Sequence, residues 1–256
     1  MFFPLLIAYK TMVRKEIARF CRVWVQAFLP NLVTTALYLI IFGRVIGNHL
    51  GLVDGVPYSL FIAPGLIMLA MINAAFSGSA FSLFSAKFQN TFDEVLVAPL
   101  PTSLILSAYI TVGIIRGFIA AGLVGLVVTC FIPFSVHAWL LSIVIVILSS
   151  ALLSALGLIN AIYAKNFEQI SMIPSFVLTP LTYLGGVFYS ISALPPLWQH
   201  LSHMNPIYYI ISSFRYSLLN ISNHSVSLYL VLLAILTCVL VFIAHYLFHS
   251  RFGMKD

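Results

Sequence analysis

The sequence predicts an all-α polytopic membrane protein, and three observations lead to this class. Hydrophobic residues make up 62% of the 256-residue chain and charged residues only 7%, whereas an ordinary soluble domain carries about 25% charged residues. Long apolar tracts, of which residues 140–163 form one, reach the roughly 20 residues that a helix needs to cross a bilayer core. These tracts also lack the alternation of apolar and polar residues that membrane β-barrel strands show.

Hydropathy predicts six membrane-spanning helices. We expect them near residues 25–47, 56–82, 103–132, 137–163, 170–190 and 226–249.

The charges in the connections orient these helices. Placing both termini in the cytoplasm puts nine basic residues on one side, namely Lys10, Arg14, Lys15, Arg19, Arg22, Lys87, Lys165, Arg251 and Lys255. The other side keeps only Arg44 and Arg215, so the positive-inside rule predicts two cytoplasmic ends. The net charge of +6 then indicates topology and contact with anionic membrane lipids, and not nucleic-acid binding.

Residues 8–24 predict an amphipathic helix that lies in the membrane surface before the first span. On a helical wheel its apolar residues occupy one half and its five basic residues the other. Glu16 falls on the apolar half, where its role is unexplained. This helix is either a plain topology anchor or a lever that transmits motion to the first span.

The stretch TFDEVLVAPLP, residues 91–101, joins the second and third spans on the cytoplasmic side. Its acidic pair favours the first turn of a helix, and its prolines end that helix. We expect a short exposed helix over residues 91–97 that docks a cytosolic partner, with a solvated loop as the alternative. The residues expected to meet the partner are Phe92, Asp93, Glu94 and Leu96.

Residues 185–215 contain the breaks Gly185-Gly186, Pro195-Pro196 and Asn205-Pro206, which interrupt any single helix. We expect two short re-entrant helices that dip into the outer leaflet. The aromatic side chains form either an interfacial belt or an outer gate that meets a lipid tail or a sugar ring during exit. They are Tyr183, Phe188, Tyr189, Trp198, Tyr208 and Tyr209.

Arg116 lies near the middle of the third apolar tract, where an arginine is costly and marks a functional site by default. No acidic residue lies at comparable depth in another span. We therefore expect its partners to be backbone carbonyls, neutral polar groups or a transported group such as a lipid phosphate. Alternatively, the span begins later and Arg116 snorkels to the inner interface.

The sequence contains no pattern that predicts a metal site, a catalytic site or ATP hydrolysis. His200 and His203 have a spacing that metals tolerate but lack a nearby carboxylate or cysteine ligand, so no metal site is expected. The spans hold no acid pair and no Ser/His arrangement that would support catalysis. They also lack the midplane acids of a secondary transporter. No G-x-x-x-x-G-K-[ST] motif occurs, so the chain cannot hydrolyse ATP by itself.

Taken together, the entry helix, the six spans, the FDEVLVAPLPTS segment and the late stretch GGVFYSISALPPLWQHLSHMNPIYYIISSFRYSLL resemble a type-2 ABC exporter permease. The nearest kind is the YadH-like inner-membrane permeases of Gram-negative bacteria. The resemblance covers essentially the whole chain and implies one permease domain over residues 1–256. It also makes residues 91–97 a coupling helix that sits in a groove of a separate ATPase.

This resemblance further implies two permease chains with two ATPase subunits, which bind the ATP and its magnesium ion. The permease pair is a homodimer or a heterodimer with a second permease. The expected cargo is a lipid, a lipid-linked glycan or an amphipathic drug-like molecule, because the spans are apolar and weakly charged. The alternatives are a non-catalytic membrane assembly factor and an ATP-independent transporter.

Overall fold

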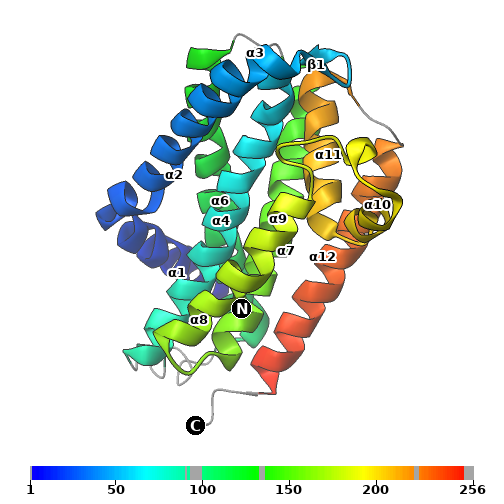
Figure 1. The fold of residues 1–256 in the computed structure, drawn as a ribbon. Coiled ribbons are helices and arrows are strands. Elements are labelled where there is room, and N and C mark those ends of the chain that lie inside the picture. The colour runs from blue at the N-terminus through cyan, green and yellow to red at the C-terminus, as the bar shows by residue number, and fades with distance from the viewer. Residues whose placement is uncertain (1, 90, 93–99, 133–135, 222–224, 251–256) are drawn as a thin grey trace.

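The computed structural model describes residues 2–89, 91–92, 100–132, 136–221 and 225–250. Over these residues the chain is a helical bundle with a short β-hairpin at one end (Figure 1). The all-α polytopic class is therefore confirmed. Five helices in this described part are long and apolar enough to cross a membrane: Trp24–Gly43, Tyr58–Phe88, Thr102–Phe131, Trp139–Tyr163 and Val226–His249.

In the first half of the chain, the hairpin joins two long helical stretches. Its elements are α1 (Phe2–Arg22), α2 (Trp24–Tyr38), the π-helix η1 (Leu39–Ile46), α3 (Gly47–Leu50), β1 (Leu52–Val53), β2 (Val56–Pro57) and α4 (Tyr58–Phe88). The hairpin turns at Asp54 and Gly55, which both have positive φ, as an Asp-Gly turn favours.

The second half contains three more long helices and a set of short ones. Its elements are α6 (Thr102–Phe131), α7 (Trp139–Tyr163), α8 (Phe167–Ile173), the π-helix η2 (Pro174–Leu178), α9 (Thr179–Leu184), the 3₁₀-helix η3 (Ile191–Ala193), α10 (Pro196–His203), α11 (Pro206–Leu219) and α12 (Val226–His249).

The expected spans agree with the long helices to within a few residues, with two differences. α4 ends at Phe88, six residues beyond the expected end at residue 82, because the helix continues through Leu83 and Phe84, which are buried in the protein, to Lys87 and Phe88. The span expected at 170–190 is a run of three short segments, α8, η2 and α9, that ends at Leu184. Pro174 and Pro180 lie within this run, and each removes a backbone donor.

Small residues hold α4, α6 and α7 together at the centre of the bundle. A Cβ atom at Gly113 or Gly117 of α6 would overlap a serine hydroxyl of α7. A Cβ atom at Gly157 of α7 would lie 2.5 Å from the Phe76 carbonyl oxygen of α4. Such close backbone approach is typical of helices packed inside membranes.

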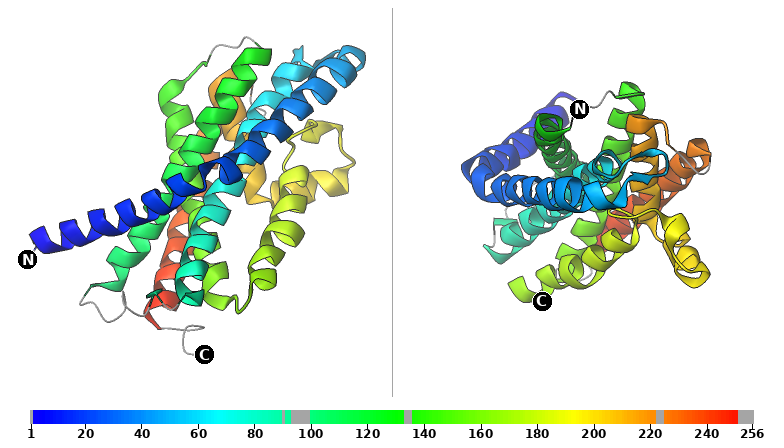
Figure 2. Two further views of the ribbon diagram at one scale, coloured as in Figure 1. Left: turned by 90° about the vertical axis from the view of Figure 1, so that its left-hand side faces the viewer. Right: turned by 45° about the horizontal axis from the view of Figure 1, so that its top comes forward.

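α1 leaves the bundle at a steep angle to the long helices (Figure 2). It ends at Arg22, and Val23 has non-helical backbone angles before α2 begins at Trp24. The inner side of α1 packs on α6, where the Tyr9 hydroxyl lies 2.7 Å from Thr111 Oγ1. We call this break between α1 and α2 the elbow.

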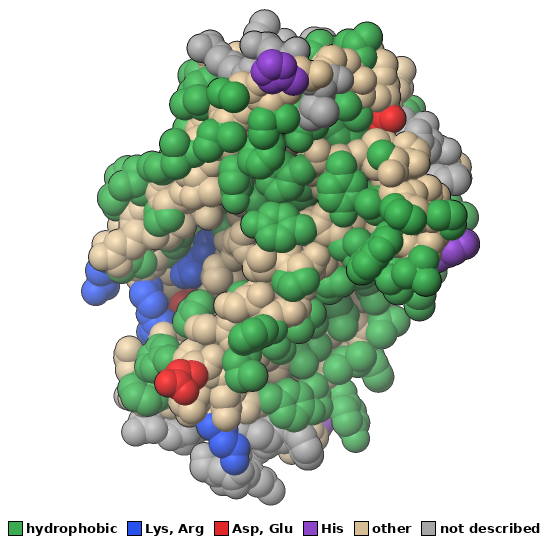
Figure 3. Space-filling model, in the orientation of Figure 1, with side chains coloured by type: hydrophobic (Ala, Val, Ile, Leu, Met, Phe, Trp, Pro, Cys, Tyr) green, Lys and Arg blue, Asp and Glu red, His purple; other side chains and the backbone are tan. Residues whose placement is uncertain are grey.

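Much of the surface that the bundle presents is apolar (Figure 3). α2 and α12 bury few of their side chains within the protein, whereas α4 buries most of its own. Residues such as Leu37 on α2 and Phe242 on α12 are 52% and 69% exposed. Large apolar side chains are exposed along both helices, which suits contact with lipid or with another apolar chain.

Candidate functional site

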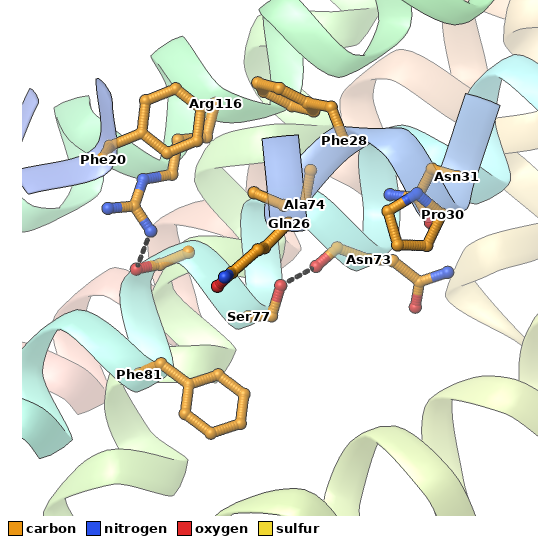
Figure 4. Close-up of a pocket in the computed structure, with 12 residues that line it drawn as sticks. Phe20, Gln26, Phe28, Pro30, Asn31, Asn73, Ala74, Ser77, Phe81 and Arg116 are labelled. Carbon is orange, nitrogen blue, oxygen red and sulfur yellow. Dashed lines mark hydrogen bonds between the residues drawn. The ribbon is translucent and has the colours of Figure 1, made fainter. Parts of the chain in front are cut away.

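A cavity of about 380 Å³ opens at the elbow, between α1, α2, α4 and α6. Its walls combine aromatic and small apolar side chains with a few polar groups (Figure 4). The polar side chains that line it are Gln26, Asn31, Asn73, Ser77 and Arg116. Figure 3 shows the surface hollowed below α2, with Lys and Arg side chains beside the hollow.

Arg116 is the charged residue of this cavity. Its Nη1 donates a hydrogen bond of 3.0 Å to the Gly78 carbonyl oxygen of α4 (Figure 4). Its guanidinium carbon lies 4.7 Å from the centroid of the Phe20 ring of α1, a cation–π distance. The expectation of a backbone carbonyl partner therefore agrees with the geometry. Among the described residues, the buried Nε atom has no hydrogen-bond partner.

Gly78 makes room for this arginine. A Cβ atom at this position would lie 2.6 Å from Arg116 Cδ. The side chain of Arg116 therefore lies directly against the backbone of α4, which fixes the direction in which the guanidinium points.

Glu16 lies beside this site, a position that could not be inferred from the sequence. It is only 5% exposed, accepts a hydrogen bond from the Ser82 hydroxyl and forms an ion pair of 3.4 Å with Arg19. Its carboxylate acts electrostatically on Arg116. This acidic residue comes from α1 and not from another span. Its place on the apolar half of the helical wheel was the one sign in the sequence that it is buried.

The expected outer aromatic residues fall into two separate clusters. In the first, the Phe188 ring packs against Tyr183, Tyr38 and Phe42 at centroid distances of 5.9, 5.3 and 5.1 Å. The Tyr58 hydroxyl donates a hydrogen bond of 2.8 Å to the Phe188 carbonyl oxygen. This cluster therefore joins the end of α9 to the C-terminal end of the first span.

The second cluster joins α11 to α12. The hydroxyls of Tyr208 and Tyr229 are 3.3 Å apart, and the Tyr209 ring lies 4.9 Å from that of Tyr229. The Tyr209 hydroxyl also donates to the His203 carbonyl oxygen.

The remaining two predicted gate residues belong to neither cluster. Trp198 is 49% exposed on α10, on a face it shares with Leu197 and Leu201. Tyr189 is half-buried in the turn before η3. The structure thus does not bring all the predicted gate residues together.

Arg215 connects α11 to α4 and to the turn after α9. It is buried, and it donates to the carbonyl oxygens of Phe61 at 3.3 Å and Gly186 at 2.7 Å. Gly186 has a φ of +82°, a conformation that glycine adopts at little cost. Next to this arginine, the Ser190 hydroxyl donates a hydrogen bond of 2.8 Å to Asp54 of the hairpin.

The expected coupling helix lies mostly outside the described residues, and Asp93, Glu94 and Leu96 are among those not described. Phe92 is described and is 3% exposed. Its ring packs edge-on against that of Phe248 on α12, with centroids 5.6 Å apart. The segment after α4 is thus held against the end of the last helix.

The chain was compared with known proteins. Residues 7–219 match the model of the ABC-2 type transporter family. Over 217 residues the chain is 49% identical to inner membrane transport permease YadH of Escherichia coli K12, a match that covers 85% of each chain. It is also 25% identical over 228 residues to nodulation protein J of Sinorhizobium fredii, which covers 89% of this chain and 87% of that protein.

Proposed function

The chain belongs to the ABC-2 type transporter family, and from this premise we propose that it is the membrane permease subunit of an ATP-driven exporter. The observation that carries the proposal is the family match over residues 7–219 in a chain that has no phosphate-binding loop. ATP and magnesium are then bound by a separate cytosolic ATPase, of which two copies serve two permease chains. We take the pair to be a homodimer, with a second permease as the other arrangement.

In this proposal the chain crosses a bacterial inner membrane six times, with both termini in the cytoplasm. The name of the 49% identical relative, an inner membrane transport permease, supports this location. The fifth crossing is the run α8, η2 and α9, which continues over 18 residues from Phe167 to Leu184. α1 lies in the inner surface of the membrane, with its exposed basic residues toward anionic headgroups.

Residues 91–97 act as the coupling helix, with Asp93 and Glu94 facing basic groups of the ATPase. The buried contact between Phe92 and Phe248 supports this role, because it attaches the segment to α12 and through it to the bundle. A movement imposed on the segment by the ATPase would then reach the membrane. ATP binding shifts the balance between inward-facing and outward-facing states by favouring one of them.

The cargo that fits best is lipid-like, a lipid-linked glycan or an amphipathic drug-like molecule. The apolar surfaces of α2 and α12 and the mixed lining of the elbow cavity support this class. In the same proposal, residues 185–215 form the outer re-entrant region. The clusters around Phe188 and Tyr208 would form the outer gate together with Trp198 and Tyr189, because their rings offer stacking surfaces to a sugar or a chain.

The proposal is tested by mild purification of the chain from its native membrane and identification of the proteins that accompany it. We expect an ATPase with a phosphate-binding loop, at near-equal stoichiometry. Charge reversal by Asp93→Lys with Glu94→Lys should release it, whereas Lys10→Glu, on the basic helix α1, should not. Recovery of the chain alone, with no binding of the native ATPase on addition, would instead favour the assembly factor or an ATP-independent transporter.

A further inference from the structure

We propose that the elbow cavity binds the anionic headgroup of a lipid, a phosphate or a carboxylate, with Arg116 as the cation that holds it. The inference rests on the proposed function in one respect, the placement of α1 in the inner membrane surface. It adds a site, and a class of ligand, that membership of the family does not specify.

The first argument is the charge balance around the cavity. Glu16 attracts Arg116, but its carboxylate also pairs with Arg19 and accepts a hydrogen bond from the Ser82 hydroxyl, so one negative charge serves two arginines. The described contacts of the Arg116 guanidinium are a carbonyl oxygen and an aromatic ring, both uncharged. A positive charge in an apolar setting favours an anion that replaces lost water.

The second argument is the supply of hydrogen-bond donors. The side-chain amides of Gln26, Asn31 and Asn73 line the same cavity, and among the described residues none of the three makes a hydrogen bond. Gln26 is exposed and the other two are partly exposed, so their amides can turn toward a ligand. The buried Arg116 Nε is also unpartnered within that part of the chain. Buried polar groups are normally satisfied, and a phosphate or carboxylate supplies several acceptor oxygens at once.

The third argument favours a lipid over a free ion. The other walls are apolar and include Phe28, Pro30 and Phe81 (Figure 4). A volume of about 380 Å³ exceeds what a lone phosphate occupies and lies in the usual range for small organic ligands, about 300–1,000 Å³. The remaining space and its apolar walls suit the glycerol and the upper part of an acyl or prenyl chain.

The fourth argument is depth. Phe20, which covers the guanidinium, belongs to the last turn of α1, and nearby Arg22 and Lys15 are exposed. With α1 in the membrane surface, Arg116 lies at the level where lipid headgroups meet their chains. Arg116 can then lie at the inner interface of the membrane and also contact a transported lipid.

The test is a titration of the purified, delipidated full chain in an uncharged detergent, read by native mass spectrometry. The probes are phosphatidylglycerol, phosphatidylcholine and inorganic phosphate. We expect one tight phosphatidylglycerol site per chain, at least tenfold tighter than any phosphatidylcholine site. Arg116→Gln should weaken that site at least tenfold, whereas Arg116→Lys should retain most of the affinity because the charge remains.

Matched controls separate this site from the basic surface of α1. Arg14→Gln removes an exposed cation of the same helix that does not line the cavity and should leave the tight site intact. If Arg116→Gln fails to fold, Gln26→Phe fills the cavity from an exposed position and should also abolish tight binding.

Equal phosphatidylglycerol affinity in Arg116→Gln and the parent protein would overturn the proposal, as would unchanged affinity in Gln26→Phe. Binding of inorganic phosphate as tight as that of the lipid would overturn the lipid part in favour of a soluble anion. No ATPase is present in this titration. A failure to find a partner ATPase therefore leaves its result standing, and the two proposals fail separately.

Discussion

The guanidinium carbon of Arg215 lies 3.9 Å from the centroid of the Phe61 ring, so a cation from α11 rests on an aromatic face of α4. The same side chain reaches two carbonyl oxygens, one on α4 and one at Gly186. One residue thus fixes α11, the turn after α9 and the central helix α4 relative to one another.

Replacement of Arg215 should therefore destabilise the end of the bundle that carries α11 and the hairpin. Arg215→Met removes the side-chain donor to both carbonyl oxygens and the cation on the Phe61 ring, and should lower the free energy of unfolding by about 2–4 kcal/mol. Arg215→Lys should recover only part of this, because an ammonium group cannot reproduce the planar fork of a guanidinium. Thermal unfolding in detergent measures both, and Arg14→Gln, at an exposed position, should leave the midpoint unchanged. A midpoint for Arg215→Met equal to that of the parent protein would contradict this account.

A second prediction concerns the central helix contacts. Gly157→Ala places a methyl group 2.5 Å from the Phe76 carbonyl oxygen and 2.6 Å from Ser79 Oγ, so α4 and α7 must move apart. We expect a loss of about 1–3 kcal/mol in stability, as for other overpacked cores. The measurement is the thermal unfolding midpoint of the purified chain.

The matched control is Gly122→Ala on α6, where an added Cβ meets nothing within 4 Å. Alanine is favoured over glycine in a helix by about 1 kcal/mol, so this variant should be as stable as the parent protein or more so. A destabilised Gly122→Ala would mean that another chain packs closely at this position. Equal midpoints for Gly157→Ala and the parent protein would contradict the packing argument.

The long lipid-facing helices could be predicted from the sequence because hydropathy reports the surroundings of each residue directly. α12 spans the expected residues 226–249, and α6 is displaced by one residue from the expected 103–132. α4 continues six residues beyond its expected end, through buried Leu83 and Phe84 to Lys87 and Phe88, and is longer than one membrane crossing needs. Hydropathy locates the apolar part of a helix and does not locate its hydrogen-bonded end.

The contacts that define the candidate site were harder to predict, because they depend on how distant segments fold together. Arg116 was recognised as unusual, but its neighbour Glu16 arrives from a helix outside the spans. Likewise, Phe188 was grouped with the outer aromatic residues, yet it packs against Tyr38 of the first span. Periodicity identifies which face of a helix is buried and leaves its partner unspecified.

A third prediction concerns the start of α11. The Asn205 side chain accepts a hydrogen bond of 3.0 Å from the Ile207 N–H and donates one to the Leu181 carbonyl oxygen of α9. Asn205→Ala removes both and should cost about 1–2 kcal/mol, the range for loss of an N-terminal cap.

Asn205→Asp separates the two contributions, since a carboxylate still caps Ile207 but cannot donate to Leu181. We expect its unfolding midpoint to fall between those of Asn205→Ala and the parent protein. If Asn205→Asp is instead as stable as the parent, the bond to α9 contributes nothing. If it is as unstable as Asn205→Ala, repulsion between its second carboxylate oxygen and the Leu181 carbonyl oxygen cancels the stabilisation from the cap.

The last prediction concerns Phe92 and Phe248, whose rings meet edge-on where the proposed coupling segment follows α4. Both side chains are almost fully buried, so Phe92→Ala and Phe248→Ala should each lower stability by about 3 kcal/mol. Since each variant removes the same ring contact, the double variant should cost less than the sum, by about 0.5–1.5 kcal/mol. Phe242→Ala, at a 69% exposed position of α12, should change stability by no more than about 0.5 kcal/mol.

Both buried variants should also recover less ATPase on purification, because the segment that carries Asp93 and Glu94 loses its attachment to the bundle. Strict additivity of the two substitutions, or normal ATPase recovery with both, would show that this attachment does not position the coupling segment.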